Sequence, residues 1–118
     1  MKTVKRYLGR LRHPVIISFD KRLRRFYGYY SFDGKTHKIV ISPWKNKTDE
    51  RNSELKNLIQ TTLHEIRHIN QWKKLKSSFW SKRNLADNSP SELDARDFEE
   101  KYIDDALTFY RKCKDQGR

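Results

Sequence analysis

The stretch from Asn52 to Lys74 constrains the fold of this 118-residue sequence more than any other feature. Its apolar residues recur at intervals of three and four positions, the period of an amphipathic α-helix; they are Leu55, Leu58, Ile59, Leu63, Ile66 and Ile69. A helix that begins at Asn52 or Ser53 must bury this apolar side against other elements. A single domain over residues 1–118 is expected, because the chain has no room for a second independent core.

The segments before this helix predict a small sheet. Three runs are rich in β-branched and aromatic residues, at 15–19, 25–32 and 37–42. Asp33 and Gly34, between the second and third runs, are typical of a hairpin turn because both tolerate a positive φ. We therefore expect a three-stranded antiparallel sheet that ends at Pro43, followed by a polar loop over residues 45–52.

A second helix is predicted after residues 75–88, which follow neither the helix nor the strand period and are expected to form a linker. This helix should cover residues 89–113, with Ser89 as its N-cap and Pro90 at its first helical position. A sheet followed by two helices makes the expected fold class α+β. The C-terminal residues 112–118 would form a free tail or a plug in a cleft.

Two histidines, His64 and His68, lie four positions apart within the first predicted helix. On a helical wheel they fall about 40° apart and opposite the centre of the apolar stripe. The simplest interpretation is that they are ordinary helix residues on an open surface. However, their side of the helix carries Asn57, Thr61 and Trp72 rather than lysines and arginines. We therefore expect this side to be covered or to line a cleft.

The spacing of the histidines suits a metal. Residues four apart on a helix stack on one face, so His64 and His68 can bind one Zn²⁺. Glu65, one position after the first histidine, should reach the water on the metal and act as its general base. The pattern is that of the zinc-binding helix of metalloproteases.

A catalytic zinc site also needs a third protein ligand and an open position. The metzincin pattern would place a glycine and a histidine at the positions of Gln71 and Lys74, so that class is excluded. Glu92 is the candidate ligand, because on the wheel it lies beside the apolar side of the second helix. Glu99 lies on the same side and could hold a ligand histidine in place.

Glu92 has a competing structural role. Ser89 and Glu92 fit a capping box, in which the glutamate reaches back to a backbone N–H at the start of the helix. Ser91 could instead be the cap, with Asp94 at its third position, and Glu92 would then remain available to a metal.

These two motifs resemble those of the gluzincin metallopeptidases, which combine His-Glu-x-x-His with a downstream glutamate helix. In several branches that helix reads Glu-x-x-Ala-x-x-Phe, matched here by the run from Glu92 to Phe98, with Ala95 in the middle. The resemblance implies a zinc endopeptidase with His64, His68 and Glu92 as ligands and Glu65 as general base. In size the chain is most similar to the single-domain minigluzincins, some of which are latent. Its layout is also similar to the peptidases that cleave phage-type repressors and to SprT-like proteases that act on DNA-bound proteins.

The resemblance also implies that an edge strand before the zinc helix binds the substrate as an added strand. Residues 37–43 have the corresponding place in the chain. Larger gluzincins use a tyrosine or histidine to stabilise the oxyanion, and no residue stands out for this role; the candidates are Tyr29, Tyr30, His37 and Tyr102. Weak or narrowly restricted activity is therefore expected.

The formal charge of +12 raises an alternative function. Nine basic residues fall within the first 25, where Tyr7 and Phe19 are interspersed, with Phe26 and Tyr27 just after. Such a segment could bind nucleic acid, and the basic N-terminal residues 1–14 would be part of it. It could equally be a solvated surface that only aids solubility. A third alternative, a purely structural zinc site, would need a fourth protein ligand that the sequence does not offer.

The sequence also bears on location. Cys113 is the single cysteine, so no internal disulfide can form. The N-terminus carries charges where a signal peptide would have its apolar stretch, and no run has the length of a membrane span. We therefore expect a soluble, intracellular protein, located in the cytoplasm.

Overall fold

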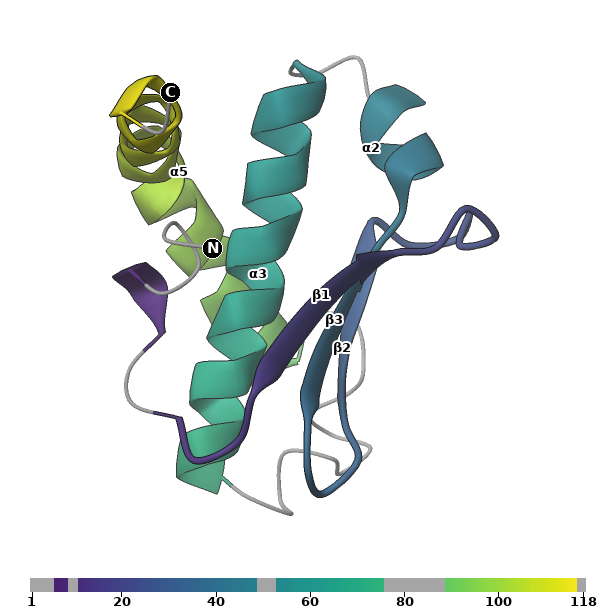
Figure 1. Cartoon of the computed structure of the whole chain (residues 1–118). Helices are drawn as coiled ribbons and strands as arrows, with labels where there is room; N and C mark the ends of the chain where they lie inside the picture. The colour runs from purple at the N-terminus through teal and green to yellow at the C-terminus, as the bar shows by residue number, and fades with distance from the viewer. Residues whose placement is uncertain (1–5, 9–10, 49–52, 76–88, 117–118) are drawn as a thin grey trace.

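The computed structural model describes residues 6–8, 11–48, 53–75 and 89–116. Its central feature is a long helix that lies between a small sheet on one side and a second long helix on the other (Figure 1). The strands are β1 (Val15–Phe19), β2 (Gly28–Phe32) and β3 (His37–Ile41), and the helices are α2 (Pro43–Thr48), α3 (Glu54–Leu75) and α5 (Pro90–Gln116). The predicted α+β class is confirmed.

The sheet is mixed, so the prediction of a purely antiparallel sheet is wrong. Its order is β1-β3-β2, with β1 parallel and β2 antiparallel to β3. The run of Ile39, Val40 and Ile41 is buried on both faces of the sheet, which favours the central position for β3. Residues 20–27 carry the chain from β1 to the opposite edge, where β2 begins at Gly28 rather than at residue 25.

The central position of β3 overturns another expectation. A strand paired on both sides cannot take a substrate as an added strand, so the prediction that residues 37–43 form the edge of a cleft is wrong. Of the two edge strands, β2 packs closely on α3. A Cβ atom added at Gly28 would lie 2.8 Å from Cγ2 of Thr61 and 2.8 Å from the carbonyl oxygen of Val40.

The hairpin between β2 and β3 forms where it was predicted. Oδ1 of Asp33 accepts hydrogen bonds from the backbone N–H groups of Lys35 and Thr36, both at 2.8 Å. Gly34 has a φ of 95°, which glycine adopts without strain.

A short helix replaces part of the polar loop predicted at residues 45–52. Ser42 caps α2, since its Oγ accepts a hydrogen bond from the backbone N–H of Lys45 at 2.9 Å, and Pro43 takes the first helical position. The side chain of Asn46 is buried and connects α2 to α3, because its Oδ1 accepts a hydrogen bond from the Thr61 hydroxyl at 2.7 Å. Residues 49–52 lie outside the described part.

Helix α3 matches its predicted bounds closely, but it is buried on two sides rather than along one stripe. Its residues Ile66 and Ile69 pack against the sheet, in a cluster with Tyr30, Ile39 and Ile41. On the other side, Ile59 and Leu63 pack against α5, in a cluster with Ile103, Ala106 and Leu107.

Helix α5 begins at Pro90 as predicted, and the Oγ of Ser89 accepts a hydrogen bond from the backbone N–H of Glu92 at 3.3 Å. Ser89 is therefore the cap, and Ser91 lies inside the helix. The helix continues to Gln116, so residues 112–116 are not a tail, and residues 117 and 118 lie outside the described part. At about 1.5 Å per residue, this end lies more than about 30 Å along the helix from Glu92 and does not plug the site. Of the predicted linker, Leu75 belongs to α3 and residues 76–88 lie outside the described part.

None of the described helices is both long enough and apolar enough to span a membrane.

Candidate metal centre

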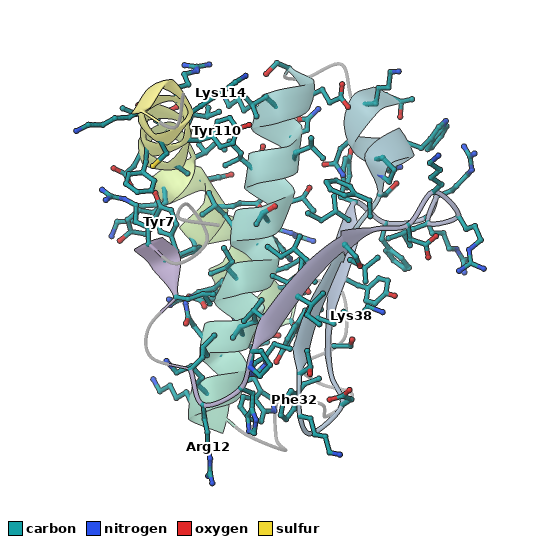
Figure 2. All side chains as sticks on the ribbon, viewed as in Figure 1. Tyr7, Arg12, Phe32, Lys38, Tyr110 and Lys114 are labelled. Carbon is teal, nitrogen blue, oxygen red and sulfur yellow. The ribbon has the colours of Figure 1, made fainter. Side chains whose placement is uncertain are left out.

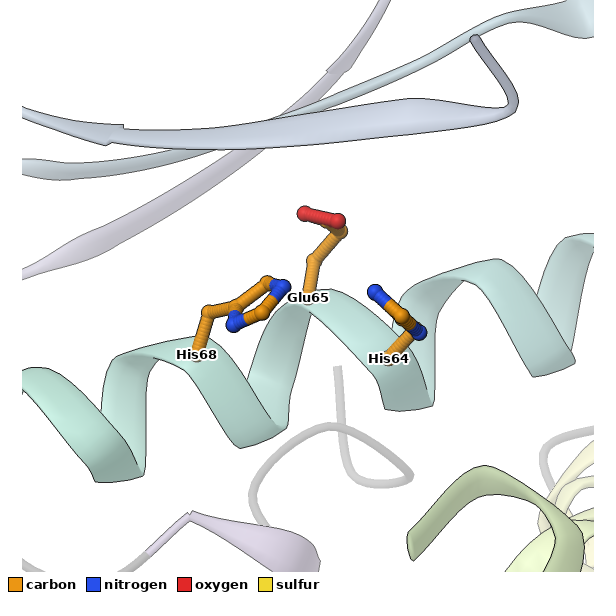
Figure 3. Close-up of side chains that lie close together, drawn as sticks. All are labelled: His64, Glu65 and His68. Atoms are coloured by element: carbon orange, nitrogen blue, oxygen red, sulfur yellow. The ribbon is translucent and has the colours of Figure 1, made fainter. Parts of the chain in front are cut away.

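His64, Glu65 and His68 form a compact group on one side of α3 (Figure 3). One ligand atom from each lies within 4.8 Å of the others. The two imidazole rings are 4.8 Å apart between centroids and nearly perpendicular, at 82°. Three residues that are close in sequence therefore present two ring nitrogens and a carboxylate to the same small volume.

Glu92 completes the group from the first turn of α5. Its Oε2 lies 2.9 Å from Nε2 of His64, and its Oε1 lies 3.0 Å from Nε2 of His68. Ligand atoms about 2.0–2.1 Å from a tetrahedral zinc stand about 3.3 Å apart, and each of these two distances is close to that spacing. Both carboxylate oxygens of Glu92 are therefore engaged by the histidines, and its role as a metal ligand stays a prediction.

The other nitrogen of each ring is also engaged. Nδ1 of His64 lies 3.1 Å from Oε2 of Glu99, the partner that the helical wheel predicted. Nδ1 of His68 donates to Oε1 of Gln71 at 2.8 Å. Hydrogen bonds of this kind fix the orientation of ligand histidines and leave Nε2 for the metal.

Gln71 has a second role that the sequence reasoning missed. Its Nε2 donates to the backbone carbonyl of Ser91 and to Oδ2 of Asp94, both at 2.8 Å. Asp94 also accepts two hydrogen bonds from the Arg67 guanidinium, at 2.7 and 3.2 Å. These contacts connect the first turn of α5 to α3 and so position Glu92. Gln71 lies three positions after His68 on the helix, and this spacing was the signal that could have predicted the hydrogen bond between the two side chains.

Unlike the carboxylates of Glu92 and Glu99, which are hydrogen-bonded to the histidines, the Glu65 carboxylate has an oxygen without a hydrogen-bond partner among the described residues. The residue is 5% exposed, and this oxygen is the buried Oε2. Burial disfavours the charged carboxylate and raises the pKa of Glu65, against the opposing effect of the two histidines. A buried carboxylate oxygen without a partner suits a group that exchanges a proton with a bound molecule.

The charges of the cluster favour imidazolium in the absence of a metal. Burial disfavours the charged form of His64, but hydrogen bonds to Glu92 and Glu99 outweigh it and raise the pKa of His64 to about 10. For His68, burial again disfavours the charged form, but the hydrogen bonds to Glu92 and Gln71 and the charge of Glu65 together outweigh it and raise the pKa. Hydrogen bonds from His64 and His68 lower the pKa of Glu92. A metal ion would therefore compete with protons on Nε2.

The histidine side of α3 is largely covered, as the sequence predicted. The side chains of His64 and His68 are 17% and 8% exposed. Further along this side, Asn57 and Thr61 are buried against α2 through hydrogen bonds to Asn46.

Of the oxyanion candidates, Tyr30, His37 and Tyr102 make contacts outside this group. The hydroxyl of Tyr30 lies 2.6 Å from Nδ1 of His37, and both side chains are buried. Tyr102 packs on Tyr7, and Tyr29 is exposed.

The donor set fits zinc. Two imidazoles with their Nδ1 atoms held by hydrogen bonds, together with one carboxylate, are a combination of donors that zinc accepts. Among the described residues of this cluster, Glu65 is the candidate for a fourth protein ligand. If Glu65 bound the metal, the site would be closed and structural; if it did not, the fourth position would be open to water, as in a catalytic site.

Comparison with known proteins adds no relative: no protein-family model, curated protein or solved structure matches the chain.

Proposed function

We propose that this protein is a zinc-dependent endopeptidase of gluzincin type, with His64, His68 and Glu92 as the zinc ligands. One observation carries the proposal. The Glu92 carboxylate, from a different helix, lies against the Nε2 atoms of both histidines, while their Nδ1 atoms are held by Glu99 and Gln71. This convergence goes beyond what a capping box requires of Glu92.

Glu65 is the proposed general base. A bound Zn²⁺ would supply Lewis acidity, which acidifies water and polarises a peptide carbonyl. The Glu65 carboxylate, buried and with one oxygen unpartnered among the described residues, accepts a proton from water and delivers it to the departing amine. Burial raises the pKa of Glu65, which makes its carboxylate a stronger base than an exposed glutamate.

The substrate is proposed to be an extended polypeptide. In the families that this sequence resembles, substrate aligns with an edge strand beside the zinc helix. In this fold the corresponding strand is β2, which packs on α3 at Gly28 and Thr61.

The deciding experiment compares Glu65→Gln with wild type in both zinc content and proteolysis. Wild type should contain about one zinc per chain and cleave a casein-like substrate. Glu65→Gln should keep the metal and lose about 100-fold or more of its activity, the usual contribution of a general base. The exposed Glu100→Gln on α5 is the matched control and should behave as wild type.

The zinc content and activity of the variants also distinguish the alternatives. Loss of zinc from Glu65→Gln would indicate a closed structural site with Glu65 as fourth ligand. Undiminished proteolysis by Glu65→Gln would contradict the proposed base. Retention of zinc by His64→Ala or His68→Ala would contradict the proposed ligands.

A further inference from the structure

A second feature of the molecule lies at the end of the sheet next to α2. It consists of Phe19 at the end of β1, the loop of residues 20–27, and Trp44, Lys45 and Lys47 of α2, and we call it the aromatic–basic surface. The loop projects from the body of the protein at the right of Figure 1, below α2. Figure 2 shows nitrogen-tipped side chains extending from this loop.

Three large aromatic side chains are exposed on this surface. Phe19 is 60% exposed, Phe26 57% and Trp44 43%. Single exposed apolar residues are ordinary in a soluble protein. Here, however, three aromatic rings occur on neighbouring segments, and a phenylalanine has no polar group to offset its exposure to water.

The charge of this surface is strongly positive. It carries six basic residues against one acidic residue, Asp20; they are Lys21, Arg22, Arg24, Arg25, Lys45 and Lys47. The Asp20 carboxylate is bound by its neighbour Arg22, since its Oδ1 accepts hydrogen bonds from the backbone N–H and the side chain of Arg22. Within the described chain, the other five basic residues form no ion pair.

Cations and rings are interleaved on this surface. The guanidinium of Arg24 lies 4.9 Å from the centre of the Trp44 ring, and Nζ of Lys45 lies 5.3 Å from that of Tyr27. These cation–π contacts place positive charge beside flat apolar faces.

Buried hydrogen bonds hold the loop in place. The Ser42 hydroxyl donates to the carbonyl of Leu23 at 2.6 Å, and Nδ2 of Asn46 donates to the carbonyl of Tyr27 at 3.0 Å. Ser42 and Asn46 are fully buried, and Asn46 is itself bound by Thr61 of α3. The exposed rings and cations are therefore carried on a fixed support, which lowers the entropy lost on binding a ligand.

We propose that the aromatic–basic surface binds single-stranded nucleic acid, with unpaired bases stacked on the exposed rings and phosphates contacted by the basic residues. Stacking on aromatic side chains beside a positively charged track is the general mode of single-strand binding. An acidic peptide would satisfy the charges but offers no base faces to the rings. A duplex keeps its bases stacked inside and would leave Phe19 and Phe26 exposed.

This surface overlaps the end of the basic segment that the sequence suggested, at Phe19 and residues 20–27, but it adds residues of α2 and does not include residues 1–14. Arg6 forms an ion pair with Asp105 of α5 at 3.1 Å, and residues 1–5, 9 and 10 lie outside the described part. The proposed binding requires no metal and does not depend on peptidase activity.

The test measures binding of a fluorescently labelled oligothymidylate by anisotropy, at several salt concentrations. Phe26→Leu keeps an apolar side chain but removes the ring, and should weaken binding about fivefold or more, whereas Phe26→Tyr should retain it. Arg24→Gln/Arg25→Gln should lower the slope of log K against log salt by about 1.4, for two lost phosphate contacts. An oligouridylate of equal length tests RNA in parallel.

The controls lie on α5. Leu93→Ala removes an apolar side chain that is 48% exposed, and Arg111→Gln/Lys112→Gln removes two exposed charges; both should bind as wild type. Equal binding by Phe26→Leu and Phe26→Tyr would contradict stacking of bases on this ring. Equal effects of Arg24→Gln/Arg25→Gln and Arg111→Gln/Lys112→Gln would contradict binding at the aromatic–basic surface. Tighter binding of duplex DNA or of polyglutamate than of the oligonucleotides would overturn the choice of ligand.

Discussion

Nε2 of His64 lies 2.9 Å from Oε2 of Glu92, a residue 28 positions further along the chain. The two residues belong to different helices, so the packing of α3 on α5 determines whether the candidate metal centre exists. The single apolar cluster that contains Ile59 and Leu63, and the contacts of Arg67 and Gln71 with Asp94, hold the helices together. Binding of a metal by these residues would therefore be coupled to the packing of the two helices, and changes at either should affect the other.

Replacement of Glu92 by glutamine should lower the affinity for zinc by more than about 100-fold, beyond the range usual for residues that only support a ligand. The amide has no charge to neutralise the metal and contacts both histidines less strongly. Competition with a chromophoric chelator measures the affinity. Glu100→Gln removes an exposed carboxylate of the same helix and should leave it unchanged. Equal affinity of Glu92→Gln and wild type would show that Glu92 is not a ligand.

Changes at Glu99 should produce a graded effect. Glu99→Ala removes the acceptor for Nδ1 of His64 and should weaken zinc binding by about 10- to 100-fold. Glu99→Gln keeps an oxygen that can accept this hydrogen bond, so its effect should be smaller. The same chelator titration applies to both variants. If the two variants were equally impaired, the charge of Glu99 rather than its hydrogen bond would be responsible.

Local signals predicted the elements of this fold well, because each depends on a few neighbouring residues. The strand at Val15–Phe19, the turn at Asp33 and Gly34, and the Ser89 cap follow from propensity, turn chemistry and capping. The Ser42-Pro43 pair carries the same start signal as Ser89-Pro90, and α2 was missed because six residues are too few to show a helical period.

Strand order depends on contacts between distant segments and could not be read from the same signals. The buried run at Ile39–Ile41 is typical of a central strand, but the hairpin alone is compatible with either edge. In the candidate site, too, residues from one helix could be predicted, whereas contacts between helices could not. His64, His68 and Glu65 come from one helix, whereas the contact of Gln71 with Asp94 and Ser91 depends on how α5 crosses α3.

Gly28→Ala should destabilise the protein by about 1–3 kcal/mol, as overpacking of a close contact generally does. The added methyl group would lie 2.8 Å from the Val40 carbonyl oxygen and 2.8 Å from Cγ2 of Thr61. Thr61→Ser removes only the second of these contacts and should rescue part of the loss. Urea denaturation measures the free energy of unfolding for the two single variants and the double variant. Strictly additive effects would show that Gly28 and Thr61 are not in contact.

The hydroxyl of Tyr7 donates a hydrogen bond to Asp105, which also accepts one from Nε of Arg6 at 3.1 Å. This contact attaches the N-terminal segment to α5, where the Tyr7 ring packs on Phe98 and Tyr102. Tyr7→Phe keeps the ring and removes the hydroxyl, so it should lower the free energy of unfolding at neutral pH. This loss of unfolding free energy should become smaller both in acid and at high pH.

Burial, with the hydrogen bond to Asp105, raises the pKa of Tyr7 to about 12 from an unfolded value of about 10. A raised pKa contributes stability that is complete below pH 10 and is lost as the pH rises through 12. Hydrogen bonds from Arg6 and Tyr7 lower the pKa of Asp105, so its contribution is complete above its unfolded pKa of about 3.9 and is lost in acid. The difference in unfolding free energy between wild type and Tyr7→Phe should therefore be largest between these limits. Urea titrations from pH 3 to 11 measure it, and Asp105→Asn should reduce it at neutral pH; a difference that does not vary with pH would contradict the hydrogen bond.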